Sequence, residues 1–116
     1  MLETTNKSFW EAVDELVSSG KILIDRPKGS FHPRFPKIKY KVDYGYLENT
    51  LSMDGEGIDV WLGSLEDKQV NAIICTVDLM KKDSEIKLLV GCTEDEINTV
   101  YEFHNNELMK GLLIRR

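Results

Sequence analysis

The sequence predicts an α+β fold in which a small, mainly antiparallel β-barrel carries an N-terminal and a C-terminal helix. Two capping boxes, each followed by apolar residues at helical spacing, mark helices towards the two ends of the chain. Between them, short β-branched runs alternate with turn residues, as is typical of antiparallel strands. Residues 1–116 are expected to form a single domain, because the length suits one core.

Each predicted helix begins at its capping box. Ser8 and Glu11 form the first box, and the helical spacing that follows runs to Gly20, which predicts a helix over residues 8–19. Thr93 and Glu96 form the second box. Apolar positions on one face then predict a helix over residues 94–109.

The strands are predicted from β-branched and aromatic runs, over residues 21–25, 40–48, 58–62, 70–79 and 86–91. A kink or bulge is expected at Gly45. All three prolines of the chain lie in residues 26–39, which excludes a central helix or strand there and indicates a long ordered loop. Five residues of this loop are Lys or Arg. Residues 81–85 form a charged turn between the last two strands.

The composition restricts the class of partner. Twenty acidic residues against 15 basic ones give a net charge of −5, which argues against sequence-independent nucleic-acid binding. No apolar stretch approaches the ~20 residues that cross a membrane. The lone cysteines, Cys75 and Cys92, favour a reducing compartment, and no signal peptide is evident, so a cytoplasmic location is expected. Self-association into a homo-oligomer stays open.

The clearest chemical signal is an acidic turn. Asp54, Glu56 and Asp59 lie within six residues, with two glycines between them. Mg²⁺ prefers oxygen ligands, and glycines let the backbone turn tightly enough for separated carboxylates to converge. The turn therefore predicts a Mg²⁺ site, for which Mn²⁺ is a possible substitute. A solvated hairpin remains the alternative interpretation of the same residues.

Three blocks around this turn resemble the soluble, family I inorganic pyrophosphatases. They are Ile-Asp-Arg-Pro-Lys-Gly-Ser at residues 24–30, the Tyr-x-x-x-Tyr-Gly-Tyr pattern at 40–46, and Asn-Thr-Leu-Ser-Met-Asp-Gly-Glu-Gly-Ile-Asp-Val at 49–60. The resemblance is good over residues 21–63 and loose over 70–105. It implies an OB-like, pyrophosphatase-type barrel and Mg²⁺-dependent hydrolysis of inorganic pyrophosphate to phosphate by a metal-bound water.

The resemblance also implies roles for individual residues. Glu56 stands where the family has the acid that accepts a proton from the attacking water, and Tyr44 matches an active-site tyrosine. Metal ligation is implied at five acidic positions: Asp25, Asp54, Asp59, Asp83 and Glu85. Contact with substrate phosphate is expected from three basic residues of the proline loop: Lys28, Arg34 and Lys37.

The chain also departs from the family pattern. Glu56 is one methylene longer than the family's aspartate, and Gly57 replaces a usual proline. A family hairpin before the Tyr-Gly-Tyr block is nearly absent, and His104-Asn105 stands where the family has a Tyr-Lys pair that binds substrate. The metal half of the site is therefore better preserved than the phosphate half. Two alternatives follow: hydrolysis of another diphosphate, and a non-catalytic domain that binds a metal or phosphate ligand.

Overall fold

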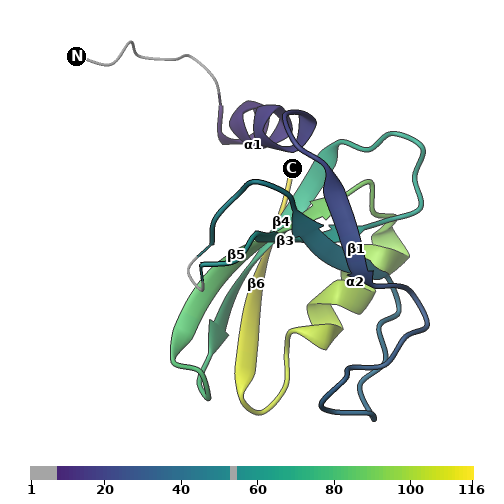
Figure 1. Cartoon of the computed structure of the whole chain (residues 1–116), viewed down its shortest axis with the longest axis vertical. Helices are drawn as coiled ribbons and strands as arrows, with labels where there is room; N and C mark the ends of the chain where they lie inside the picture. The colour runs from purple at the N-terminus through teal and green to yellow at the C-terminus, as the bar shows by residue number, and fades with distance from the viewer. Residues whose placement is uncertain (1–7, 53–54) are drawn as a thin grey trace.

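One six-stranded sheet and two helices make up the described part of the chain, residues 8–52 and 55–116 of a computed structural model (Figure 1). In chain order the elements are α1 (Phe9–Ser18), β1 (Ile22–Arg26), β2 (Asp43–Leu47), β3 (Ile58–Leu62), β4 (Val70–Asp78), β5 (Asp83–Val90), α2 (Glu94–Phe103) and β6 (Met109–Arg115). Across the sheet the order is β1-β2-β3-β5-β4-β6. Strands β3 and β5 pair in parallel, and every other neighbouring pair is antiparallel. The predicted α+β class with a mainly antiparallel sheet is thus confirmed.

The sheet is not closed into a barrel, so that part of the prediction is wrong. In the described residues β1 and β6 are the two outer strands, and no ladder of hydrogen bonds joins them. The physical reason is that the sheet buries apolar side chains on both faces, whereas a small barrel has a single interior. Val60 and Trp61 are neighbours in β3, yet each is buried in a different core cluster.

The two cores lie on opposite faces of the sheet because successive strand residues point to opposite sides. On one face, Val13 of α1 packs in a cluster with Val60 and Leu88. On the other face, Val100 of α2 belongs to a cluster with Trp61 of β3, Leu89 of β5 and Ile74 of β4. Each helix therefore covers one face. The candidate functional residues, as shown below, share the face that α2 covers.

The helix starts were predicted correctly. The Ser8 hydroxyl accepts from the Glu11 backbone N–H, and the Glu11 carboxylate accepts from the Ser8 N–H, so the first capping box is formed. Thr93 and Glu96 form the second in the same way. Neither helix of the described residues is long and apolar enough to cross a membrane.

The end of the second helix was predicted wrongly. α2 stops at Phe103, not at residue 109, and the chain turns through Asn105 and Asn106. The Asn106 side chain accepts from the backbone N–H groups of Leu108 and Met109, which favours a turn over another helical turn. The residues that follow form β6, a strand that the sequence analysis did not predict. It pairs with β4 from Ala72 to Asp78.

The remaining predictions differ mainly in their boundaries. β3 has the predicted bounds, β1 is shifted by one residue at both ends, and β4 ends one residue earlier than predicted. β2 is shorter than predicted, and β5 begins at Asp83, so the turn before it spans residues 79–82. Residues 27–42 form the predicted long loop, in which one isolated bridge joins Phe31 and Lys39. The acidic turn is only partly described, because Asp54 lies outside the described residues.

The irregularity expected at Gly45 lies on the opposite strand. The ladder between β1 and β2 shifts between Ile24 and Arg26, so Asp25 is the extra residue of a bulge. Gly45 pairs with Ile24 at this point, and a Cβ atom on Gly45 would lie 1.8 Å from the Leu23 carbonyl oxygen. β1 can therefore approach β2 this closely only because residue 45 has no side chain.

Replacing Gly45 by alanine is expected to destabilise the protein by about 3 kcal/mol, because the collision is with backbone and cannot be relieved by a rotamer change. Urea denaturation with linear extrapolation measures the change in unfolding free energy. Gly20→Ala is the control, because its added Cβ would meet its nearest atom, the Glu48 carbonyl oxygen, at 3.1 Å. Equal losses in the two variants would contradict the assigned role of Gly45.

Candidate functional site

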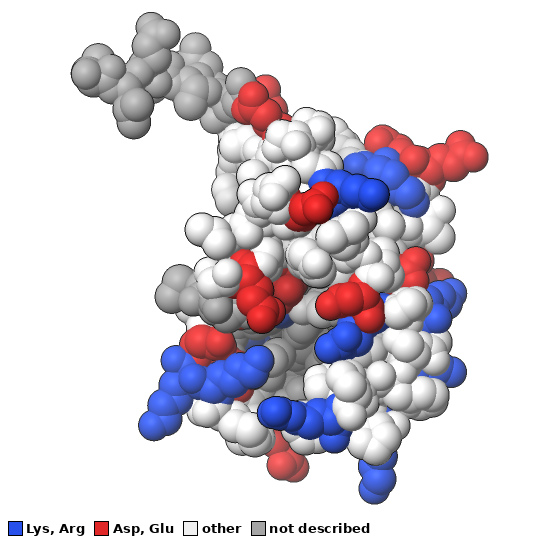
Figure 2. All heavy atoms as spheres, viewed as in Figure 1, with Lys and Arg blue, Asp and Glu red and all other residues white. Residues whose placement is uncertain are grey.

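A cavity of about 590 Å³ opens on the sheet face that α2 covers. Figure 2 shows a hollow on one face of the molecule, with acidic and basic side chains around it. Among the described residues, four acidic side chains line the cavity: Asp25, Glu56, Asp59 and Glu85. Four side chains that are basic or can become so line it too: Arg26, His32, Lys81 and Lys87. The cavity is therefore rich in both signs of charge.

Strand register brings the central residues of the cavity together. Tyr44 pairs with Trp61 across β2 and β3, and Val60 pairs with Leu88 across β3 and β5. Asp59 and Lys87 precede Val60 and Leu88, so they lie beside one another on adjacent strands. Residues two apart in a strand share a face, which places Glu85 on the same side as Lys87. Three separate strands thus supply one cluster.

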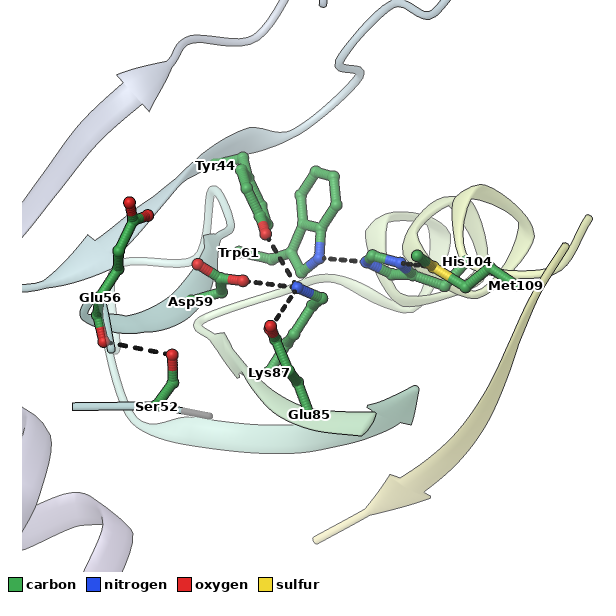
Figure 3. Close-up of polar contacts among 9 residues, drawn as sticks. All are labelled: Tyr44, Ser52, Glu56, Asp59, Trp61, Glu85, Lys87, His104 and Met109. Carbon is green, nitrogen blue, oxygen red and sulfur yellow. Dashed lines mark hydrogen bonds and ion pairs between the residues drawn. The ribbon is translucent and has the colours of Figure 1, made fainter. Parts of the chain in front are cut away.

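The Lys87 ammonium is the centre of this cluster (Figure 3). Its Nζ donates to Asp59 Oδ2 at 2.5 Å and to Glu85 Oε2 at 3.1 Å. It also donates to the Tyr44 hydroxyl at 3.1 Å. The side chains of Lys87 and Glu85 are only 8% and 9% exposed, so this charge pair is largely shielded from water. A buried ammonium needs such partners, since an isolated charge in a protein interior is very unfavourable.

Burial and mutual attraction set the protonation of the cluster. Burial raises the pKa of Glu85, which the charge of Lys87 partly opposes. Burial by itself would lower the pKa of Lys87, but Tyr44 and Asp59 outweigh it and hold that pKa above its usual value. Burial also raises the pKa of the Tyr44 hydroxyl. Lys87 is therefore charged and Tyr44 keeps its proton near neutral pH.

A second polar chain runs from Trp61 towards β6. The Trp61 indole N–H donates to His104 Nε2 at 3.0 Å, and His104 Nδ1 lies 3.2 Å from the Met109 sulfur (Figure 3). Because Nε2 accepts, the ring proton is on Nδ1. Burial, aided by the Lys87 charge, lowers the pKa of His104 to about 3. His104, the C-cap residue of α2, is therefore a buried histidine with both ring nitrogens in contact with polar partners.

The structure brings some of the residues predicted for metal binding and catalysis together and leaves others apart. Tyr44, Asp59 and Glu85 form the cluster around Lys87, and Asp25 and Glu56 also line the cavity. Asp83 begins β5 opposite Asp78 and does not line it. Asp54 lies outside the described residues.

The three predicted phosphate contacts lie away from this cluster. A second cavity adjoins the first and is described below. Lys28 and Arg34 line neither cavity, and Lys37 lines only the second. The backbone N–H of Lys28 donates to Asp43, and that of Arg34 donates to His32 Nδ1, so both contacts shape the loop. Their roles towards a substrate stay predictions.

Lys87 is the residue that sequence reasoning missed. Its partners Asp59 and Tyr44 are 28 and 43 residues away in the chain, so no local pattern marks it. The alternation of Glu85 and Lys87 before an apolar run looks like the solvated face of a strand. A signal does exist: a lysine directly before a fully apolar strand segment is a candidate for burial, and so needs an acidic partner.

The donor atoms of this cluster fit a hard divalent cation. Carboxylate oxygens of Asp59 and Glu85 converge on one positive charge, and such oxygens are the ligands that Mg²⁺ and Mn²⁺ prefer. Within residues 8–52 and 55–116, no three acidic, histidine or cysteine side chains stand close enough together to hold a metal. The described residues therefore bring two carboxylates together, and the Lys87 ammonium occupies the position between them.

Comparison with known proteins finds a distant similarity. No family model matches the chain. The chain is 28% identical over 106 residues to a protein named inorganic pyrophosphatase from Halalkalibacterium halodurans, and the match covers 78% of this chain. It spans 64% of the length of that relative. The resemblance to inorganic pyrophosphatases that the sequence motifs indicate is thereby confirmed as a distant one.

Acid is expected to destabilise the protein through His104. Its pKa is about 3 when folded and near 6.5 when unfolded, so the unfolded state binds the extra proton between these values. The contribution of neutral His104 to the unfolding free energy is complete above about pH 6.5. It is lost as the pH falls, by about 2 kcal/mol between pH 7 and pH 5. Urea denaturation at both pH values should show this loss in the wild type and a smaller one in His104→Gln. An equal loss of unfolding free energy in the wild type and in His104→Gln would contradict this role of His104.

Removing the Lys87 ammonium should leave two carboxylates facing each other without a cation. Lys87→Met is expected to lower the unfolding free energy by about 3–5 kcal/mol, whereas Lys82→Met, in an exposed turn, should have little effect. Millimolar Mg²⁺ should raise the melting temperature of Lys87→Met more than that of the wild type, because the metal replaces the lost charge. An equal rise in both proteins would contradict a shared cation position.

Proposed function

We propose that this chain hydrolyses inorganic pyrophosphate to phosphate with the help of Mg²⁺. The observation that carries the proposal is the convergence of Asp59, Glu85 and Lys87 within one cavity. The similarity to a protein named inorganic pyrophosphatase supports it. Because the chain spans 64% of that relative, the activity is inferred from the site and not transferred from the whole protein.

The charges of the cavity suit a multiply anionic substrate. Arg26 and Lys81 line it and can donate to phosphate oxygens. The Lys87 ammonium, whose three N–H bonds go to Tyr44, Asp59 and Glu85, adds a positive charge. Tyr44 keeps its proton, so its hydroxyl can accept from Lys87 and donate to an oxygen of the substrate. In the partly buried cavity such contacts are stronger than they would be in water.

The acidic residues are proposed to hold the cation and to accept a proton. Asp59 and Glu85 would be ligands, joined by Asp25 and Asp54 if these reach the same ion. A bound Mg²⁺ neutralises phosphate charge and lowers the pKa of water from 15.7 towards ~7. Glu56 lines the cavity and is exposed to solvent, so its carboxylate is the proposed acceptor of the proton that the attacking water loses.

A non-catalytic domain that binds a metal or phosphate ligand is the second candidate. The observation that favours it is the position of Lys28 and Arg34, which were predicted to contact substrate and line neither cavity. Such a domain would keep the Lys87 cluster as a structural feature. It would bind Mg²⁺ weakly or not at all, which calorimetry can measure.

Phosphate release from pyrophosphate with Mg²⁺ at neutral to mildly alkaline pH tests the proposal. The wild type should release phosphate, and Asp59→Asn should be slower by roughly a thousand-fold, because a lost metal ligand removes several kcal/mol of transition-state stabilisation. Asp67→Asn is the matched control, since Asp67 is exposed and lines neither cavity.

Two outcomes of this assay would contradict the proposal. No release above the blank at high protein concentration, with Mn²⁺ also tried, would exclude pyrophosphate hydrolysis. Release that survives in Asp59→Asn would instead show that the cluster around Lys87 is not the site of the reaction.

A further inference from the structure

A second cavity of about 620 Å³ adjoins the first. Five residues line both cavities and form the boundary between them: His32, Tyr40, Tyr44, Lys81 and Lys87. Cavities of this size commonly hold small organic ligands. A ligand with two chemically different parts could therefore extend from one cavity into the other.

The wall of the second cavity is aromatic. Tyr40, Trp61 and Phe103 all line it, and their ring centroids are 5.1–6.0 Å apart. Tyr40 and Trp61 are buried, so this wall is fixed by the core. At the rim, Phe35 and Ile38 of the proline loop are 52% and 39% exposed. Two large apolar side chains thus face a cavity that contains water when no ligand covers them.

Polar groups accompany this aromatic wall. Thr99, Glu102 and Asn106 line the cavity from α2 and the turn after it. Five lysines also line it: Lys37, Lys39, Lys41, Lys81 and Lys87. A ligand that fits would present a flat apolar surface, polar groups at its edges, and negative charge. Pyrophosphate has only the last of these, so it does not explain the cavity.

The cavity is lined by the segments in which the chain departs from the pyrophosphatase pattern. The proline loop, where a family hairpin is nearly absent, contributes Phe35, Lys37 and Ile38. His104, which stands where the family has a substrate-binding tyrosine, also lines it. The segments that depart from the family pattern therefore line the same cavity as the aromatic wall.

We propose that the second cavity binds the nucleoside part of a nucleoside diphosphate. The base would lie against Phe35 and the aromatic wall, with its polar edge towards α2, and the diphosphate would extend to Lys81 and Lys87 in the first cavity. An isoprenyl chain would leave Thr99, Glu102 and Asn106 against hydrocarbon, which disfavours it. Base stacking on aromatic side chains is a general source of affinity for nucleotides.

As a statement about substrate, the inference rests on the proposed function. Hydrolysis would join the water oxygen to the β-phosphorus and break the bond from that phosphorus to the bridging oxygen. The bridging oxygen leaves with the nucleoside monophosphate, and the water's proton passes to a carboxylate of the first cavity. The products are a nucleoside monophosphate and phosphate, and no other reactant is needed.

Calorimetric titration with ADP and with pyrophosphate, each in the presence of Mg²⁺, tests the inference. The titrations use both the wild type and Asp59→Asn, so that binding is measured without requiring turnover. ADP should bind about tenfold more tightly than pyrophosphate. Phe35→Ala should weaken ADP binding about tenfold and leave pyrophosphate binding unchanged. Phe31→Ala is the matched control, because Phe31 is an exposed phenylalanine of the same loop that lines neither cavity.

Three results would overturn the inference: ADP that binds no more tightly than pyrophosphate, equal effects of Phe35→Ala and Phe31→Ala on ADP, or tighter binding of geranyl diphosphate than of ADP. The two proposals fail separately. If pyrophosphate is not hydrolysed but ADP binding depends on Phe35, the nucleoside site stands and the proposed hydrolysis does not. If pyrophosphate is hydrolysed and Phe35→Ala does not weaken ADP binding, only the nucleoside site is excluded.

Discussion

The parallel pairing of β3 with β5 is the constraint on which the candidate site depends. It places Lys87 beside Asp59, and the two-residue repeat of the strand adds Glu85 to the same face. A buried ammonium is tolerable only with such partners, so the strand register and the charge cluster support one another. Two carboxylates that converge on one positive charge are also an arrangement that can bind a divalent cation.

The two faces of the sheet each carry a buried core, but they are lined by different kinds of side chain. The face under α1 is lined by aliphatic residues such as Val60 and Leu88. The face under α2 carries the charged cluster and the aromatic wall beside it, which meet where the Tyr44 and Trp61 rings lie 4.4 Å apart. The buried aromatic side chains thus form the boundary between a charged cavity and one with an aromatic wall, which is an arrangement suited to a ligand with both kinds of surface.

Local patterns predicted the local structure well. The capping boxes at Ser8 and Thr93 and the β3 run were found because their signals lie within a few residues. The end of α2 was missed because apolar spacing continues to Leu108, while the turn at Asn106 depends on side-chain bonds to the backbone. Barrel closure and the role of Lys87 depend on which strands become neighbours, and neither is encoded in any short stretch of sequence.

The most direct test of this account is an anomalous difference map from crystals grown with Mn²⁺. The account predicts a Mn²⁺ peak bound by carboxylate oxygens of both Asp59 and Glu85, with the Lys87 ammonium moved away from at least one of them. The contradicting result is a map without a peak at these carboxylates, in which Lys87 still bridges Asp59 and Glu85. The cluster would then be a structural ion pair, and the cation site would have to be sought elsewhere in the chain.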